Sequence, residues 1–146
     1  MTTYADSSFL VSRYVKDAFT ERAKAWLAGH SHNLPLTEFG RVELRNAFAR
    51  LTFAGSLTAT QASAAWQMIE ADIKQRRLAP ITVEWSLAFG RAEELTAKHT
   101  GQLGTRTLDV LHVAIALSLR CTEFVTFDQR QGTLAKASGL NWQLPA

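Results

Sequence analysis

The chain has 146 residues, of which 47% are hydrophobic and 20% charged, and its formal net charge is +3 at pH 7. This length fits one compact domain, and 8 glycines and 3 prolines are too few for a long linker or a disordered tail. A single cysteine excludes an intrachain disulfide and a cysteine-rich zinc site. No apolar run is long enough to span a bilayer, and the first residues lack the pattern of a signal peptide. We therefore expect a cytoplasmic protein without a membrane partner.

Basic residues are spread along the whole chain rather than gathered in a tail. Lysine and arginine total 16 against 13 aspartates and glutamates, and arginine outnumbers lysine by 11 to 5. Arginine suits paired contacts to phosphate oxygens. This balance is compatible with an anionic partner such as a nucleic acid.

Predicted strands and helices alternate along the chain. Short β-prone runs predict strands at residues 2–5, 33–36, 81–83, 123–127 and 141–143. Apolar residues at helical spacing predict helices at residues 9–14, 17–29, 37–55, 84–99 and 108–119, one from Thr58 or Thr60 through Ile73, and one ending at Ala137. Residues 100–104 are expected to form a loop. The order implies one α/β domain over residues 1–146, with a mainly parallel sheet.

Four acidic residues stand where such a fold brings side chains together, because ligands bind beyond the carboxyl ends of parallel strands. Asp6 ends the first predicted strand, Asp128 ends the fourth, and Asp109 opens the apolar helix between them. Glu43 lies in the helix after the second strand. Each also has a structural explanation, as a helix cap, a partner of a helix dipole or a solvated side chain. Four acids from four elements together favour a shared site.

A cluster of carboxylates predicts a bound cation. Two carboxylates about 5 Å apart repel by roughly 3 kcal/mol at an effective dielectric of about 20. Four would raise one another's pKa values or move apart unless a cation neutralised them. Oxygen ligands select Mg²⁺ or Mn²⁺ over zinc, and such sites suit hydrolysis of a phosphodiester.

Four segments carry a resemblance to a known family. Residues 4–11 (YADSSFLV), 42–48 (VELRNAF), 104–117 (GTRTLDVLHVAIAL) and 124–140 (FVTFDQRQGTLAKASGL) resemble the signature segments of PIN-domain proteins. Within that family the chain is similar to the VapC-type ribonuclease toxins of bacterial toxin–antitoxin pairs. The family's acids map onto Asp6, Glu43, Asp109 and Asp128, which are thus expected to be both catalytic and metal-binding.

The resemblance implies a five-stranded parallel sheet flanked by helices and Mg²⁺- or Mn²⁺-dependent cleavage of RNA. It also implies a homodimer and inhibition by a cognate antitoxin. Some relatives carry further acids beside the last two metal-binding positions, where this chain has Thr107, Gln129 and Gln131. A second metal is therefore expected to be held weakly.

Other polar residues lie near the predicted site. Ser8 and Thr126 could orient a carboxylate, although local roles in a helix or strand explain them equally well. His112 is expected to be a core histidine bonded to the backbone rather than a general base. Arginines within seven residues of the four acids are candidates for RNA binding, with solvated surface charges as the alternative: Arg13, Arg45, Arg106 and Arg130.

Three classes of function stay open at this stage. A metal-dependent endoribonuclease of the toxin type is the main prediction. The alternative is a PIN-like module that binds RNA or protein without catalysis, against which the four retained acids argue. An aspartyl-phosphate enzyme or receiver domain would need a second acid two residues after Asp6, where the chain has Ser8.

Overall fold

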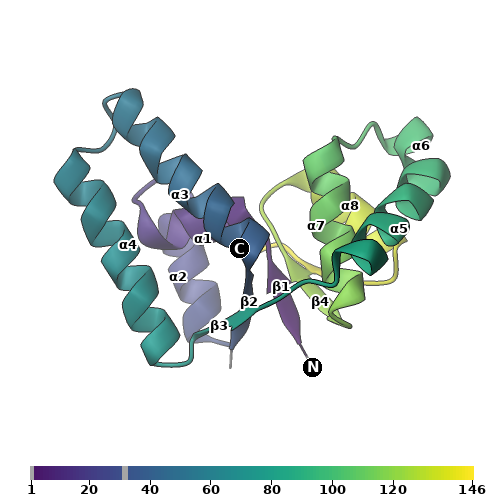
Figure 1. Cartoon of the computed structure of the whole chain (residues 1–146), viewed down its shortest axis with the longest axis horizontal. Helices are drawn as coiled ribbons and strands as arrows, with labels where there is room; N and C mark the ends of the chain where they lie inside the picture. The colour runs from purple at the N-terminus through teal and green to yellow at the C-terminus, as the bar shows by residue number, and fades with distance from the viewer. Residues whose placement is uncertain (1, 31–32) are drawn as a thin grey trace. The chain divides into compact units, whose positions relative to one another are not determined.

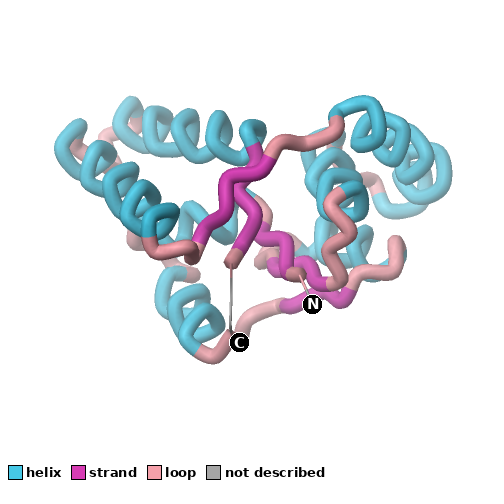
Figure 2. The backbone as a smooth tube through the Cα atoms, turned by 60° about the horizontal axis from the view of Figure 1, so that its bottom comes forward, coloured by secondary structure: helices cyan, strands magenta, loops and turns pink. Residues whose placement is uncertain are grey.

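A computed structural model describes residues 2–30 and 33–146. The chain forms two compact units that interleave in sequence. Unit 1 contains the chain up to Asp6 and Thr82–Ala146, and unit 2 contains Ser7–Ile81. Figure 1 follows the chain by colour, and Figure 2 separates its helices and strands. Within the described residues, none of the helices is long and apolar enough to cross a membrane.

Unit 1 is built on a three-stranded parallel sheet. Its strands are β1 (Thr3–Ala5), β4 (Glu123–Val125) and β5 (Asn141–Gln143), in the order β1-β4-β5. These strands agree with the predicted ones, apart from a fourth strand that ends two residues early. Because β1 and β4 are parallel and in register, the residues that follow them meet at one edge of the sheet. Those residues are Asp6 and Thr126.

The helices of unit 1 include one that is buried on most sides. They are α5 (Trp85–Leu95), a π-helical turn (Thr96–Thr100), α6 (Gly101–Leu103), α7 (Thr107–Ser118) and α8 (Gln129–Ala137). Seven consecutive residues of α7, Val110–Ala116, are buried, which explains its apolar composition. Helix α5 packs against α7 (Figure 1).

The predicted loop at residues 100–104 is wrong. The chain stays helical through Leu103, because Thr100 and Gly101 continue the turn instead of ending it. The helical path ends at Gly104, whose φ of 65° is the left-handed conformation that favours glycine. This turn leads the chain into α7 and its first-turn aspartate, Asp109.

Unit 2 is a helical layer with one pair of strands. Its elements are α1 (Ser7–Tyr14), α2 (Thr20–Ala28), β2 (Leu34–Thr37), α3 (Glu38–Phe53), α4 (Ala59–Lys74) and β3 (Leu78–Ile81). Thr37 caps α3 by accepting a hydrogen bond from the Gly40 N–H. Thr58 and Gln61 form a reciprocal capping box at the start of α4, which settles the choice between Thr58 and Thr60.

The prediction of one five-stranded sheet is also wrong. Strands β2 and β3 pair in parallel with each other, and in the described part of the chain they form a sheet separate from β1-β4-β5 (Figure 2). Each carries a proline, Pro35 in β2 and Pro80 in β3, which has no N–H to donate to a further neighbour. The third strand also lies earlier than residues 81–83, since Pro80 belongs to the strand instead of preceding it.

A close approach between α8 and β5 fixes one side of unit 1. Gly132 of α8 lies directly against the ring of Trp142 in β5, so a Cβ at this position would overlap the indole. The same indole donates a hydrogen bond through Nε1 to the Thr126 carbonyl, at 3.2 Å. The packing of α8 is thereby connected to the sheet edge at which β4 ends.

We expect the Gly132→Ala substitution to lower the free energy of unfolding by about 1–3 kcal/mol, because the new methyl group must displace the half-buried ring of Trp142. Gly90→Ala in α5 is the matched control, since that site has open space around it. It should be neutral or stabilising by up to about 1 kcal/mol. Chemical denaturation of both variants tests the contact, and equal stabilities would contradict it.

Candidate active site

Asp6 lies at the carboxyl end of β1. Its side chain is buried, with the residue only 4% exposed. The Asp6 N–H donates to the Val125 carbonyl at 3.4 Å, which continues the β1–β4 ladder by one step. The Thr126 hydroxyl donates to Asp6 Oδ2 at 3.0 Å. A buried carboxylate is thus held by the strand next to its own.

Thr126 and Asp128 form the turn between β4 and α8. The Asp128 N–H donates to Thr126 Oγ1 at 3.0 Å, so this one hydroxyl contacts both aspartates. Asp128 also caps α8, since its Oδ1 accepts a hydrogen bond from the Gln131 N–H at 2.9 Å. The capping explanation of Asp128 is therefore correct as far as it goes, and it accounts for one of the two carboxylate oxygens.

Asp109 lies in the first turn of α7, with a side chain that is 14% exposed. Its Oδ1 accepts from Gln131 Nε2 at 3.4 Å, and its Oδ2 forms a long ion pair of 3.8 Å with Arg106 Nε. Asp109 Oδ2 and Gln131 Oε1 are both buried without a hydrogen-bond partner. Two neighbouring side chains therefore each present an unsatisfied buried oxygen.

These contacts link three of the four predicted acids in one series within unit 1. We call it the aspartate network, and it consists of Asp6, Thr126, Asp128, Gln131 and Asp109. Within residues 2–30 and 33–146, no three His, Cys, Asp or Glu side chains form a compact metal-holding group. The carboxylates are connected through Thr126 and Gln131 instead. Oxygen-only donors and two orphaned buried oxygens fit a hard divalent cation.

Sequence reasoning missed the role of Gln131. The residue was noted only as standing where some relatives carry an acid, yet it is 2% exposed and contacts both Asp109 and Asp128. Its spacing of three residues from Asp128 on a helix was the available signal, because such residues share a face.

Glu43 and Ser8 belong to unit 2. Glu43 lies in α3, is half-buried and accepts a hydrogen bond through Oε1 from the Ser7 hydroxyl at 2.6 Å. Ser7 is the residue after Asp6 in the chain. Ser8 is exposed, and its carbonyl accepts from the Ser12 hydroxyl in the next turn of α1. Participation of Glu43 and Ser8 in a shared site remains a prediction.

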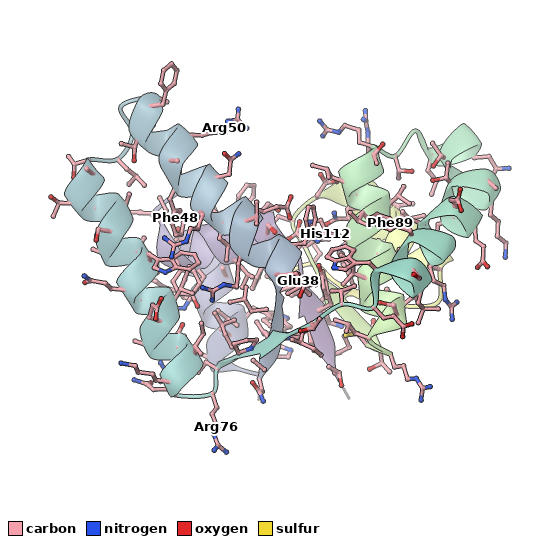
Figure 3. All side chains as sticks on the ribbon, in the orientation of Figure 1. Glu38, Phe48, Arg50, Arg76, Phe89 and His112 are labelled. Atoms are coloured by element: carbon pink, nitrogen blue, oxygen red, sulfur yellow. The ribbon has the colours of Figure 1, made fainter. Side chains whose placement is uncertain are left out.

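His112 is part of the core of unit 1. It is 4% exposed, and its Nδ1 lies 2.6 Å from the hydroxyl of Tyr4. Tyr4 in turn stacks on Phe124 of β4. Figure 3 labels His112 on α7. The predicted place of His112 in the core is confirmed, and its Nδ1 faces a tyrosine hydroxyl of β1.

The four candidate arginines have different surroundings. In unit 2, Arg13 forms an ion pair of 3.8 Å with Asp72, and the Arg45 guanidinium lies 3.8 Å from the centre of the Trp66 ring. In unit 1, the Arg106 side chain is 76% exposed beside Asp109, and Arg130 is exposed on α8. Arg106 and Arg130 are therefore the two candidates on the elements that carry the aspartate network.

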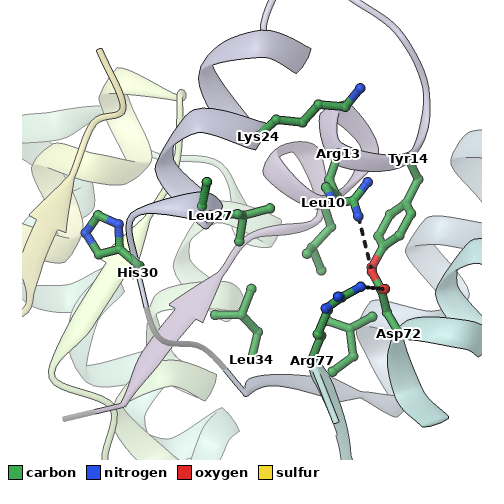
Figure 4. Close-up of a pocket in the computed structure, with 11 residues that line it drawn as sticks. Leu10, Arg13, Tyr14, Lys24, Leu27, His30, Leu34, Asp72 and Arg77 are labelled. Atoms are coloured by element: carbon green, nitrogen blue, oxygen red, sulfur yellow. Dashed lines mark hydrogen bonds and ion pairs between the residues drawn. The ribbon is translucent and has the colours of Figure 1, made fainter. Parts of the chain in front are cut away.

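A pocket of about 480 Å³ lies within unit 2, around Asp72 (Figure 4). Asp72 accepts hydrogen bonds from the Tyr14 hydroxyl at 2.6 Å and from Arg77 Nη1 at 3.2 Å. Burial, followed by the hydrogen bond to Asp72, raises the pKa of Tyr14 well above its ordinary value. Asp72 is satisfied by these partners, so the cluster stabilises the packing of α1 on α4. The available signal was the spacing of Asp72, which follows Ile69 by three residues on the buried face of α4.

The family model of the PIN domain matches residues 3–137. The chain belongs to the PIN-domain family, and the match spans both compact units. No curated protein sequence matches the chain significantly.

Solved structures share this fold at low sequence identity. VapC20 of Mycobacterium tuberculosis, described as a sarcin-ricin-loop-cleaving toxin, is 18% identical with a TM-score of 0.67, covering 99% of this chain and 100% of its own. FitAcB of Neisseria gonorrhoeae is 16% identical with a TM-score of 0.64, covering 99% and 98%. VapBC2 of Rickettsia felis, bound to a promoter DNA fragment, is 16% identical with a TM-score of 0.64, covering 98% of each chain.

Thr126→Val tests the bridge between Asp6 and Asp128. Valine keeps the shape of threonine but removes both hydrogen bonds, which should lower the free energy of unfolding by about 1–3 kcal/mol. The Asp128 amide should also exchange its hydrogen faster with solvent, as measured by NMR. Thr126→Ser is the matched control, because it keeps the hydroxyl and should keep that amide protected. Equal amide protection in all three proteins would contradict the bridge.

Proposed function

We propose that this protein is a divalent-metal-dependent endoribonuclease and the toxin of a type II toxin–antitoxin pair. The observation that carries the proposal is the aspartate network, in which three acids of unit 1 are hydrogen-bonded in series. Membership of the PIN-domain family supports the nuclease activity. The likeness to VapC20, a toxin that cleaves the sarcin-ricin loop, supports RNA as the substrate class.

Mg²⁺ or Mn²⁺ is the proposed cofactor, held by Asp6, Asp109 and Asp128. Their oxygens suit a hard cation. The buried Asp109 Oδ2 has no hydrogen-bond donor, and a cation would take the place of one. When bound, the cation polarises a phosphoryl oxygen and lowers the pKa of water, which together promote hydrolysis of a phosphodiester.

Glu43 is proposed as the fourth acid of the same site. Its hydrogen bond to Ser7 ties α3 to the residue that directly follows Asp6 in the chain. The hydrogen bond from Thr126 restricts the rotation of the Asp6 carboxylate, which would keep this carboxylate directed at the cation. Ser8 is proposed only as a neighbour of this site on α1.

Arg106 and Arg130 are proposed to bind the RNA backbone near the acids. Both are exposed, and both lie on the segments that carry Asp109 and Asp128. Guanidinium groups at such positions would contact phosphates and offset the repulsion between RNA and the carboxylates. Arg13 and Arg45 are engaged with Asp72 and Trp66, so we assign them a smaller role in RNA binding.

An antitoxin and a second copy of the chain are the proposed protein partners. Large apolar side chains are exposed on α3 and α5, among them Phe53 at 95% and Phe89 at 54% exposure. Figure 3 labels Phe89 on α5. Exposed aromatic residues of this kind are typical of surfaces that bind other proteins. A toxin that acts on RNA and is held by an antitoxin would work in the cytoplasm.

Asp6→Asn tests the proposed activity. We expect it to lower the rate of RNA cleavage in Mg²⁺ by at least about 100-fold, because it removes the charge of a buried cation ligand. Glu94→Gln is the matched control, since Glu94 is an exposed acid of α5 outside the network, and it should leave the rate unchanged. The measurement is cleavage of ribosomal and transfer RNA by purified protein. Full activity in EDTA, or in the Asp6→Asn variant, would contradict the proposal.

A further inference from the structure

Gln131 is one of the most deeply buried polar residues of the chain. It lies in the first turn of α8 and is 2% exposed. Its backbone N–H donates to Asp128, and its side-chain amide donates to Asp109. The remaining polar atom of the side chain, Oε1, is buried without a partner.

The orientation of this amide is determined by its neighbour. Nε2 lies 3.4 Å from Asp109 Oδ1 and donates a hydrogen bond to it, which favours this orientation of the amide. The reverse orientation would set Oε1 against that carboxylate oxygen, and two acceptors repel each other. The orphaned atom is therefore an acceptor, and only a donor or a cation can satisfy it.

A second orphaned acceptor belongs to the same contact. Asp109 Oδ2 is buried without a hydrogen bond, while Oδ1 of the same carboxylate accepts from Gln131. The amide and the carboxylate thus each use one end to bind the other and leave one oxygen without a hydrogen bond. The Arg106 guanidinium forms an ion pair with Asp109 Oδ2, but at 3.8 Å it is too far for a hydrogen bond. Two unsatisfied oxygens on side chains joined in this way suit one positively charged ligand.

We infer that Gln131 positions Asp109 and supplies an uncharged oxygen ligand to the divalent cation of this site. The inference rests on the proposed function, because it assumes that the aspartate network holds a cation. An amide adds a ligand oxygen without adding a negative charge, so it limits the repulsion among the aspartates when the cation is absent.

Two substitutions of similar size separate the two roles of the amide. Gln131→Met removes both the donor and the oxygen ligand, while Gln131→Glu keeps the oxygen, adds a charge and removes the donor to Asp109. Gln129→Met is the control, because Gln129 is exposed in the same turn of α8. For each protein, Mn²⁺ affinity is measured by titration calorimetry, and the melting temperature is measured in EDTA and in excess Mn²⁺.

We expect Gln131→Met to bind Mn²⁺ at least about tenfold more weakly than the wild-type protein, as is typical when a group that orients a metal ligand is lost. Gln131→Glu should melt at a lower temperature in EDTA, because two carboxylates then face each other. Its gain in melting temperature on adding Mn²⁺ should exceed that of the wild type. Gln129→Met should match the wild type in both measurements.

A purely structural role for Gln131 predicts a different pattern. The melting temperature of each variant would then fall by the same amount in EDTA as in Mn²⁺. The Mn²⁺ affinities of both variants would stay within about twofold of the wild-type affinity. This result would overturn the inference. Wild-type protein that binds no Mn²⁺ would overturn the proposed metal dependence, and the inference with it. Wild-type binding with an unaffected Gln131→Met variant would overturn the inference alone.

Discussion

The candidate site depends above all on one buried hydroxyl group. Thr126 is fully buried at the end of β4, where it donates to Asp6 and accepts from the backbone of Asp128. Its carbonyl accepts from the indole of Trp142, which packs against Gly132. The carboxyl edge of the sheet, the start of α8 and the last strand are therefore connected at a single residue, and the position of the carboxylates follows from that connection.

Neutral side chains allow several carboxylates to occupy this edge of unit 1. Thr126 and Gln131 lie between the aspartates, and each donates a hydrogen bond to a neighbouring carboxylate. The exposed Arg106 lies too far from Asp109, at 3.8 Å, for a short hydrogen bond. Asp109 Oδ2 and Gln131 Oε1 are therefore both buried without a hydrogen-bond donor. These two oxygens lie where we propose that the cation binds.

The features that could be predicted from the sequence are those encoded by neighbouring residues. Asp6 directly follows β1, and Asp128 lies in the turn after β4, so their places beyond the carboxyl ends of these strands could be derived from hydrophobic patterning and the parallel order of the strands. The contact of Gln131 with Asp109 spans 22 residues and depends on how α8 packs beside α7, which no local pattern encodes. The pairing of β2 with β3 was equally hidden, because the third strand was predicted at residues 81–83 while the structure has it at Leu78–Ile81.

A crystal structure of the full chain grown with Mn²⁺ would locate the cation directly through its anomalous scattering. We expect a Mn²⁺ peak within coordination distance of carboxylate oxygens of Asp6, Asp109 and Asp128. Mn²⁺ bound elsewhere on the protein, or an aspartate network that keeps its hydrogen bonds and takes up no ion from excess Mn²⁺, would contradict it.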